Sequence, residues 1–241
     1  SGGWILSFFT ALDRNEPPQA MSHPLVAIHQ PNFLPWLGYF DKIARSDIFV
    51  ILDSVQFSKT GGTWSNRVQM LVAGRPAWLT VPVVRSYHGV RTYREMEISA
   101  DASWRARILR TISLNYAAAP HFAAIFPVLE GIMAAPTRNL VEFNESALRA
   151  LCAGLELDAD KFVHSSALAV SGAATDLLVA IVRAVGGAAY LAGGQAAAYQ
   201  VDAQFAAAGI ELLYQKFHHP SYPQINSPSF VAGLSIVDAL M

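Results

Sequence analysis

The sequence predicts an α/β fold, with a Rossmann-like three-layer core and a mostly helical insertion. Three observations predict this class. Short apolar runs of strand length alternate with helical patterns near both ends of the chain. The stretch Leu25–Leu52 has the pattern of a strand, a loop, a helix and a strand, which is the βαβ unit of a parallel sheet. Between about residues 100 and 170, the apolar residues instead follow helical spacing.

Size and composition fit one large globular domain. The chain has 241 residues, of which 53% are hydrophobic and 15% charged, so it can bury a sizeable core. Residues 1–20 precede an internal Met21, and we expect them to be an N-terminal extension or a cloning remnant. We expect residues 21–241 to form a single α/β domain, with the helical subdomain at about 100–170.

The first half of the chain is expected to hold the βαβ unit and a hairpin. Apolar runs predict strands at Leu25–Ile28, Ile48–Leu52, Arg67–Val72 and Ala77–Val84, with a further one at Arg94–Ile98. A helix is expected from Leu34 or Pro35 to about Arg45, because proline is tolerated in a first turn. Ala-Gly-Arg-Pro between the third and fourth runs is typical of a hairpin turn.

The second half is expected to be helical before it returns to an αβ pattern. Helical spacing predicts helices at Ser103–Tyr116, His121–Met133, Thr137–Gly154, Ala174–Val185 and Ala203–Ala208. Proline or glycine separates most of these segments, as is usual between helices. Strands are expected at Ala188–Leu191 and Glu211–Phe217, so the end of the chain should return to the sheet.

Charge and cysteine content exclude several classes of function. The 17 basic and 18 acidic residues give no basic excess, so we expect no nucleic-acid partner, except a possible aminoacyl-tRNA donor, and no membrane partner. No apolar run reaches the ~20 residues of a membrane span. The lone cysteine, Cys152, allows no intrachain disulfide, which suits a cytoplasmic location. It is expected to be an inert, buried residue.

Polar residues follow the first predicted strand at its carboxyl end. His29, Gln30 and Asn32 stand between this strand and a helix whose start, near Trp36, offers free N–H groups. Ligands bind at such positions in parallel sheets. The sequence therefore predicts a small-molecule site here, with His29 as a catalytic acid or base. The alternative is a loop whose polar groups satisfy only its own backbone.

A second polar group follows the next predicted strand. Asp53 ends this strand and is the other catalytic candidate, and the residues expected to bind substrate with it are Gln56, Lys59, Trp64, Asn66 and Arg67. A guanidinium can hold a carboxylate or phosphate through two hydrogen bonds, and an indole can stack on a ring. An exposed loop with a surface ion pair would explain the same residues without a ligand.

Two further stretches add weaker candidates. Gly193 and Gly194 follow a predicted strand and allow a ligand to approach the backbone, although an ordinary turn also has this pattern. Tyr222 and Gln224 follow paired histidines near the end of the chain. Those histidines lack the spacing of known metal sites, so we expect no metal, and the residues do not indicate a cofactor.

Seven pieces of the sequence carry a family resemblance. They are AIHQPNFLPWLGYF at 27–40, LDSVQF at 52–57, WSNR at 64–67, WLTVP at 78–82, YLAG at 190–193, YPQ at 222–224 and LSIVDAL at 234–240. In order and spacing they resemble the WbqC-like protein family over roughly residues 24–241. The family glycine motif usually reads Leu-Ser-Gly, whereas Ala192 stands here, so any ligand contact of that serine is missing.

The resemblance implies a bacterial cytoplasmic protein of a surface-polysaccharide (O-antigen) or natural-product pathway. It leads us to expect a transferase that moves an acyl or aminoacyl group onto an amine of a nucleotide-linked amino sugar or related metabolite. The strand, the loop and the helix are also similar to the start of the HxGH nucleotidylyltransferases, although both signature histidines are missing. A nucleotidyl-transfer or adenylate-forming enzyme and a non-catalytic nucleotide-sugar-binding protein are the alternatives. The expected partner is a phosphate-containing small molecule, and the sequence does not predict an oligomeric state.

Overall fold

A five-stranded parallel sheet forms the centre of the computed structural model, which describes residues 23–194 and 201–241. Its strands, in the order β5-β2-β1-β6-β7, are β5 (Phe162–His164), β2 (Ile48–Ile51), β1 (Leu25–His29), β6 (Ala189–Ala192) and β7 (Glu211–Tyr214). Every pairing within it is parallel. The chain first builds outward from β1 through β2 to β5, and then crosses to the other side of β1 for β6 and β7. The predicted α/β class is confirmed.

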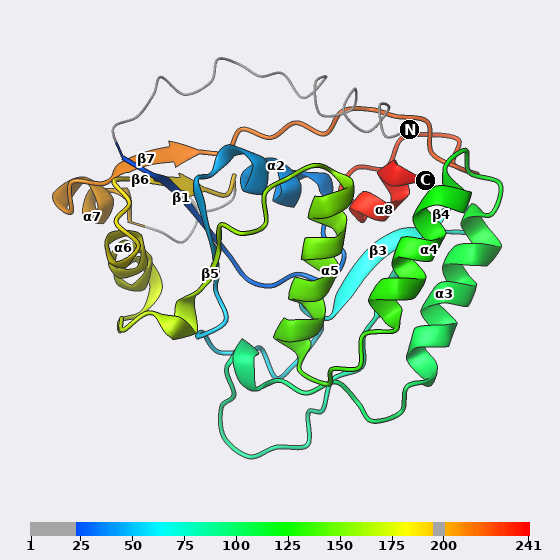
Figure 1. Cartoon of the computed structure of the whole chain (residues 1–241), viewed down its shortest axis with the longest axis horizontal. Helices are drawn as coiled ribbons and strands as arrows, with labels where there is room; N and C mark the ends of the chain where they lie inside the picture. The colour runs from blue at the N-terminus through cyan, green and yellow to red at the C-terminus, as the bar shows by residue number, and fades with distance from the viewer. Residues whose placement is uncertain (1–22, 195–200) are drawn as a thin grey trace.

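Helices cover both faces of this sheet (Figure 1). The helix α2 (Leu37–Arg45) packs on one face, and α6 (Ala174–Ala184) and α7 (Asp202–Ala207) pack on the other. Neighbouring residues of β1 show the division, because Ala27 belongs to the apolar cluster of α2 and Val26 to that of α6 and α7. This alternation follows from the two-residue period of a strand. The core is therefore a Rossmann-like, three-layer arrangement.

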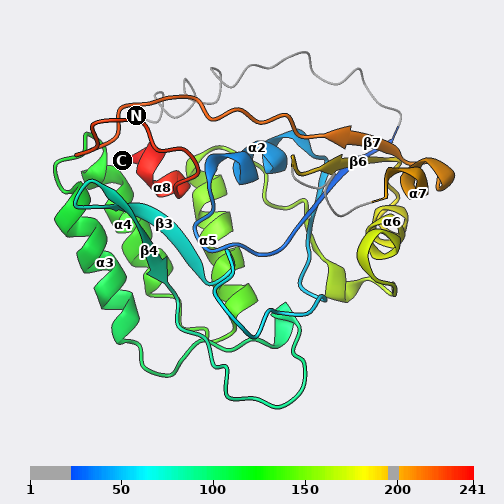
Figure 2. The same cartoon turned by 180° about the vertical axis from the view of Figure 1, so that it is seen from behind.

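The helix α5 (Leu140–Gly154) stands beside the sheet, with the short turn η1 (Tyr93–Glu95) near its lower end (Figure 1). Beyond α5, at one end of the molecule, lie the hairpin β3 (Arg67–Val72) and β4 (Arg75–Thr80) and the helices α3 (Ser103–Tyr116), α4 (Phe122–Met133) and α8 (Ile236–Leu240) (Figures 1 and 2). The apolar cluster on the α2 face of the sheet continues into these helices, where the rings of Trp104 and Phe143 meet edge to face. In residues 23–194 and 201–241, no helix has the length and apolar character needed to cross a membrane.

The predicted helix after β1 begins later than expected. Neither Leu34 nor Pro35 is its first residue, and α2 starts at Leu37. The backbone of Leu34 has a φ of 41°, which no α-helix contains. Distant segments hold the loop in this path, because the Phe33 N–H donates to the Trp64 carbonyl and the Ser235 hydroxyl donates to the Leu34 carbonyl. Tertiary contacts have therefore overridden the first-turn preference of proline.

Two predicted strands also differ from the structure. Arg94–Ile98 is no strand, since Tyr93–Glu95 forms a 3₁₀ turn that is stabilised where Thr92 donates two hydrogen bonds of 2.8 Å to the Glu95 carboxylate. The strand β4 ends at Thr80 rather than Val84, and Pro82 in the missing part has no N–H to donate to a ladder. The short elements β5, η2 (Ser165–Ala167) and α8 had no counterpart among the predicted ones.

Candidate functional site

The carboxyl edge of the parallel sheet collects polar residues from three strands. His29 is the last residue of β1, Asp53 follows β2, and His164 is the last residue of β5. Parallel strands end on the same edge, so residues 111 positions apart in the chain become neighbours here. Asp53 and His164 are in direct contact, and they form the centre of the candidate site.

His164 is clamped between two carboxylates. Its Nδ1 lies 3.0 Å from Asp53 Oδ2, and its Nε2 lies 2.8 Å from Glu145 Oε2 on α5. Arg149, one turn further along α5, binds the other Glu145 oxygen at 2.9 Å. The hydrogen bonds to Asp53 and then Glu145 raise the pKa of His164 to about 9. The ring is therefore an imidazolium at neutral pH, and both of its N–H groups are used.

Asp53 is a buried carboxylate with every oxygen occupied. It is 1% exposed and accepts hydrogen bonds from the Ser165 hydroxyl at 3.0 Å, the Ser166 N–H at 2.9 Å and the Ser166 hydroxyl at 2.7 Å. Burial alone would raise the pKa of Asp53, but the hydrogen bonds from His164, Ser166 and Ser165 lower it to about 2. This arrangement makes Asp53 a fixed anion that positions its neighbours.

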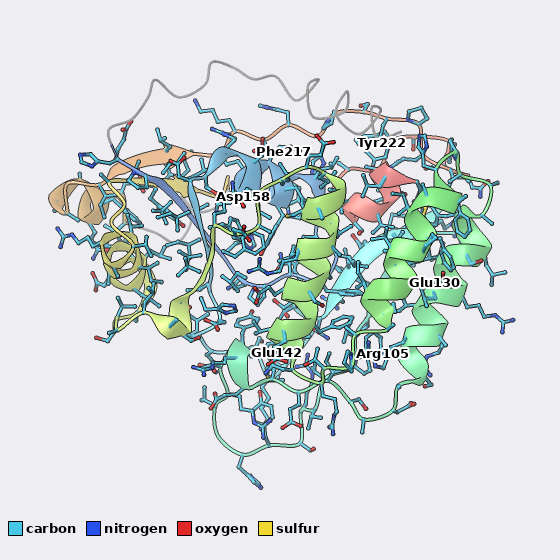
Figure 3. The ribbon with its side chains drawn as sticks, viewed as in Figure 1. Arg105, Glu130, Glu142, Asp158, Phe217 and Tyr222 are labelled. Carbon is cyan, nitrogen blue, oxygen red and sulfur yellow. The ribbon has the colours of Figure 1, made fainter. Side chains whose placement is uncertain are left out.

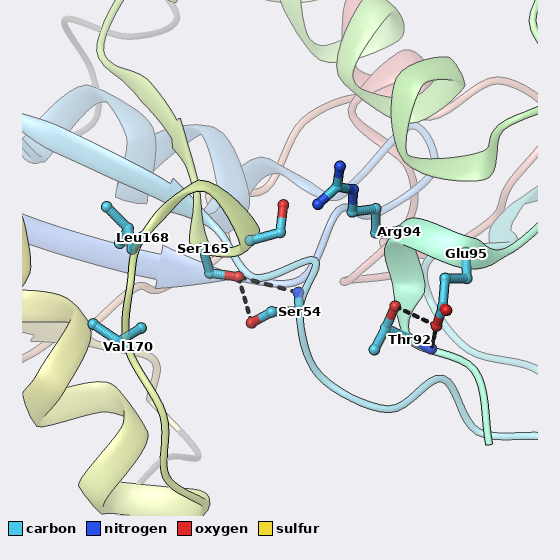
Figure 4. A pocket seen from close by; sticks show the side chains of 8 residues that line it. Ser54, Thr92, Arg94, Glu95, Ser165, Leu168 and Val170 are labelled. Carbon is cyan, nitrogen blue, oxygen red and sulfur yellow. Dashed lines mark hydrogen bonds between the residues drawn. The ribbon is translucent and has the colours of Figure 1, made fainter.

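A cavity of about 390 Å³ opens beside this cluster (Figure 4). It is lined by Ser54, Thr92, Arg94, Glu95, Ser165, Ser166, Leu168 and Val170. The Ser165 hydroxyl donates to Asp53 and accepts from the backbone N–H groups of Asp53 and Ser54, both at 3.1 Å, and the hydroxyl of Ser54 lies 2.8 Å from it. The Ser166 hydroxyl donates to Asp53 at 2.7 Å, so its hydrogen points inward and its oxygen lone pairs are left for a ligand.

Arg94 supplies the positive charge of the cavity. Its backbone N–H donates to the Asp53 carbonyl at 3.0 Å, which ties η1 to the end of β2. Its side chain extends into the space between the serines and Glu95 (Figure 4). The guanidinium has no hydrogen bond or ion pair among residues 23–194 and 201–241, although its charge, after the hydrogen bonds from Thr92, helps to lower the pKa of the neighbouring Glu95 carboxylate. Its five N–H donors are available to an anionic group.

His29 lies on the same edge but in a different environment. Its Nδ1 is 3.1 Å from the Gln30 carbonyl, and its ring packs on Tyr39 with 4.6 Å between the ring centroids. Burial, and then the charge of Lys42, lower the pKa of His29 to about 3, so the ring is neutral. Lys42 is itself 2% exposed and donates to the Ile28 carbonyl at 2.8 Å, and burial lowers its pKa to about 7.

The loop after β1 uses most of its polar groups internally. Asn32 is 4% exposed, with its side-chain oxygen 3.5 Å from the Ser65 hydroxyl. The ring of Trp36 lies against Phe217 and covers Gly38, where a Cβ atom would collide with the indole. Gln30 remains exposed at the edge of the sheet. Gly38 thus allows the close packing of α2 against this loop.

Several other predicted site residues lie outside the cavity lining. Gln56 is exposed and forms an isolated bridge with Thr92, and the Lys59 ammonium contacts the Tyr87 ring. Asn66 donates to the Val81 carbonyl and so joins two backbone segments. Gly193 and Gly194 directly follow β6 at the carboxyl edge.

Two predicted groups form separate clusters. Trp64 and Arg67 meet on the outer surface at the start of the hairpin, together with Trp78. Tyr222 lies next to α8 (Figure 3), where its hydroxyl and the Gln224 amide both bind Asp238. A substrate role for these residues stays a prediction.

Sequence reasoning missed several residues of the cavity and its cluster, namely His164, Glu145, Ser165, Ser166 and Arg94. Strand β5 has three residues, which is too short for a periodic signal. The hydrophilic pair Ser165-Ser166 directly after His164 was the available signal, since polar residues at a strand end also singled out His29 and Asp53. Among the residues that the structure describes, no group of three or more His, Cys, Asp or Glu side chains could hold a metal ion.

The imidazolium of His164 predicts a pH dependence of stability. Its pKa in the folded state, about 9, lies above its ordinary value of 6.5, so the folded protein binds this proton more tightly. The stabilisation is complete below pH 6.5 and is lost as the pH rises through about 9. Allowing for the screening of a ring that is one-third exposed, we expect the free energy of unfolding to fall by about 1–2 kcal/mol over this window.

Urea unfolding at a series of pH values would measure this change. The variant His164→Gln keeps hydrogen-bonding capacity but cannot titrate. In this variant the additional fall in the free energy of unfolding at alkaline pH should disappear. An alkaline loss of equal size in the wild type and the variant would contradict the assignment. Asp53 has the opposite effect, at acid pH. Its lowered pKa contributes stability that is complete above about pH 3.8 and is lost as the pH falls through about 2.

Comparisons with known proteins agree with the resemblance found in the sequence. The chain matches the model of the WbqC-like protein family over residues 30–241. It is also 30% identical over 217 residues to a protein of Mycobacterium tuberculosis (strain ATCC 25618 / H37Rv) that is described as "Uncharacterized protein Rv1507c". This match covers 89% of the present chain and 92% of that relative. No solved structure gives a significant match.

Proposed function

The chain belongs to the WbqC-like protein family, and from this premise we propose that it is a transferase acting on a small molecule that carries both an amine and an anionic group. The proposed reaction moves an acyl or aminoacyl group onto the amine. A nucleotide-linked amino sugar, with its phosphates and its amine, is the substrate class that we favour. This substrate class fits the polysaccharide or natural-product role, in the cytoplasm, that the family resemblance implies.

One observation carries this proposal: the cavity combines an unpaired guanidinium with acceptor oxygens. Arg94 offers donors to an anion, whereas the Ser166 oxygen offers lone pairs because its hydrogen points inward to Asp53, and the Ser54 hydroxyl lies beside it on the cavity wall. An amine donates hydrogen bonds and a phosphate accepts them, so a ligand with both groups satisfies both sides of the cavity. A purely anionic ligand would leave the serine oxygens without a donor.

The cluster behind the cavity would act by positioning. Asp53 holds the hydroxyls of Ser165 and Ser166 and the ring of His164, and its occupied oxygens leave no site for a substrate proton. In the proposed step, the amine nitrogen bonds to the acyl carbon while the bond from that carbon to its carrier breaks. The departing carrier group takes up a proton, and the amine loses one.

His29, which lies on the same edge of the sheet but not among the residues that line the cavity, remains the candidate for receiving the amine proton. Its neutral ring can accept a hydrogen bond from the amine, but a pKa of about 3 means that it would pass the proton quickly to water. The adenylate-forming alternative has no observation of its own in the described residues. The loop that it would use for phosphate instead contacts the C-terminal segment, where the Ile236 N–H donates to the Pro35 carbonyl.

Ligand affinity of an Arg94 variant tests the proposal directly. We expect Arg94→Ala to weaken the binding of UDP-glucosamine by about 10–100-fold, since a hydrogen bond to a charged group contributes about 1.5–3 kcal/mol. Isothermal titration would measure the affinity. Arg110→Ala removes an exposed arginine from α3 and serves as the matched control with unchanged affinity. Equal affinities of wild type and Arg94→Ala would refute this site.

A binding protein without catalysis is the second candidate, and one observation favours it. Both nitrogens of His164 and all oxygens of Asp53 are occupied, so neither group is free to act as a base beside the cavity. Incubation of UDP-glucosamine with acyl-coenzyme A donors, followed by mass spectrometry, separates the two candidates. Acylated product that falls in His29→Gln supports the transferase, whereas tight binding without product across several donors supports the binding protein.

A further inference from the structure

An exposed pair of tryptophans stands out on the surface of the described residues. Trp64 is 46% exposed and Trp78 is 41% exposed, and their ring centroids lie 5.2 Å apart. The other strongly exposed large apolar residues are the aliphatic side chains of Val90, Leu114, Val128 and Val201. Scattered aliphatic residues on a surface need no explanation, but adjoining exposed aromatic rings indicate a place where something binds.

The hairpin does not need these rings for its own core. Val68, Met70 and Leu79 are buried on the inner face, and Leu71 at the far end of β3 is buried as well. Trp78 pairs with Gln69 and points to the outer face, where a polar residue would serve a strand equally well. The exposed position of Trp78 therefore indicates a role other than folding.

Arg67 completes this surface. The central carbon of its guanidinium lies 4.1 Å from the centroid of the Trp78 ring. Gly62 lies on its other side, where a Cβ atom would collide with the guanidinium. The Nε of Arg67 is buried and has no hydrogen-bond partner among residues 23–194 and 201–241. Packing thus holds the arginine in one orientation, and its terminal Nη groups, rather than the enclosed Nε, are the donors left for a ligand.

We propose that Trp64, Trp78 and Arg67 form a binding site for an acidic carbohydrate, in which the sugar ring packs on the indoles and its carboxylate binds Arg67. The C–H groups of a sugar ring pack on aromatic faces, and a planar guanidinium matches a carboxylate through two parallel hydrogen bonds. None of the three residues lines the cavity at the sheet edge. The inference therefore stands without the proposed transferase activity.

The ring geometry favours a sugar over a flat base. The two indole planes are inclined at 58°, and their centroids, 5.2 Å apart, leave no room for a third ring between them. A nucleobase stacks best on a single face or between parallel rings. A saturated ring presents C–H groups in several directions and can contact both inclined planes together. The absence of a basic excess in the chain also gives a nucleic acid little electrostatic attraction.

Tryptophan fluorescence gives a direct test. The probes are an oligoglucuronate and the same oligosaccharide with its carboxylates converted to methyl esters. We expect the acidic form to change the emission of the full chain and to bind at least about 10-fold more tightly than the ester. Trp78→Ala should weaken binding of the acid by about 10-fold or more, and Arg67→Lys should remove most of the preference for the acid.

Controls keep the result interpretable. Leu114→Ala removes an exposed apolar residue from α3 and should leave binding unchanged. Trp64→Ala provides a second variant of the pair, and thermal melts would show that each variant is folded. The proposal is overturned if neither oligosaccharide binds, if Trp78→Ala binds as the wild type does, or if a single-stranded oligonucleotide binds more tightly than the acid. A dimer that Trp78→Ala dissociates would also overturn it, because the surface would then be a contact between copies of the chain.

Discussion

Substitution of His164 by alanine is expected to lower the free energy of unfolding by about 2–3 kcal/mol at pH 7. The substitution leaves Asp53, which is 1% exposed, and the partly buried Glu145 facing each other without the imidazolium between them. Breaking a fully buried ion pair costs about 3–5 kcal/mol, and the one-third exposure of His164 reduces that figure. The affinity of the cavity for its ligand should also fall, because Asp53 would no longer be held in place beneath the serines.

Urea unfolding of the two proteins at several pH values would measure the loss. The difference in the free energy of unfolding between wild type and variant should become smaller as the pH falls toward 4. At that pH the carboxylates of Asp53 and Glu145, which have lost their partner in the variant, can take up protons. His88→Ala removes an exposed histidine from a loop and serves as the matched control. A loss below about 0.5 kcal/mol, within the range of ordinary surface substitutions, would show that the cluster is a weak surface pair.

Substitution of Asp238 by alanine should have the largest effect on stability away from the cavity. Asp238 is 6% exposed and accepts hydrogen bonds from the Tyr116 hydroxyl at 2.5 Å, the Tyr222 hydroxyl at 2.8 Å and the Gln224 amide at 2.9 Å. Removing the carboxylate leaves the two tyrosine hydroxyls without their acceptor in a region where water has little access, whereas the Gln224 amide keeps the Val231 carbonyl at 2.9 Å. We expect the free energy of unfolding to fall by about 3–4 kcal/mol, which is less than the simple sum for three hydrogen bonds to a charged group because Gln224 keeps a second acceptor and neighbouring contributions are not additive.

The same variant also tests what Tyr222 and Gln224 do. If both serve to fasten α8, Asp238→Ala should leave the affinity of the cavity for its ligand within about twofold, and Asp238→Asn should lose roughly half as much stability as the alanine variant. Denaturant unfolding and titration with UDP-glucosamine would be run on the same preparations. A loss of affinity without a loss of stability would instead support the substrate role predicted for these two residues.

The sequence predicted those parts of the fold that depend on local pattern. The helix Ser103–Tyr116 and the strand Arg67–Val72 were predicted with the observed ends, and most other boundaries differ by a few residues. The failures have a common physical cause. At Leu34, and in the 3₁₀ turn Tyr93–Glu95, hydrogen bonds with neighbouring segments decide the backbone, and spacing of apolar residues carries no information about them.

The sequence predicted where the candidate site lies but not which residues enclose it. The rule that parallel strands end at one edge correctly put Asp53 and His29 there. It could not indicate that Asp53 would be enclosed by His164 and Ser165, since that depends on which strand pairs with the outer side of β2. A strand of three residues, such as Phe162–His164, is too short for a single sequence to distinguish it from a loop.

The pairing of β2 with β5 has a kinetic consequence. Phe49 and Phe162 are aligned in neighbouring strands, so the pairing must wait until a long stretch of chain, including α3, α4 and α5, has been synthesised. Contacts between such distant segments slow folding, because the entropy of closing the loop is lost before the contacts form. The contacts of His164 with Asp53 and Glu145 should therefore form only after α5 and β5 have been synthesised, later than contacts within the hairpin or between α3 and α4. A ligand that binds there would select chains in which β2 and β5 have already paired.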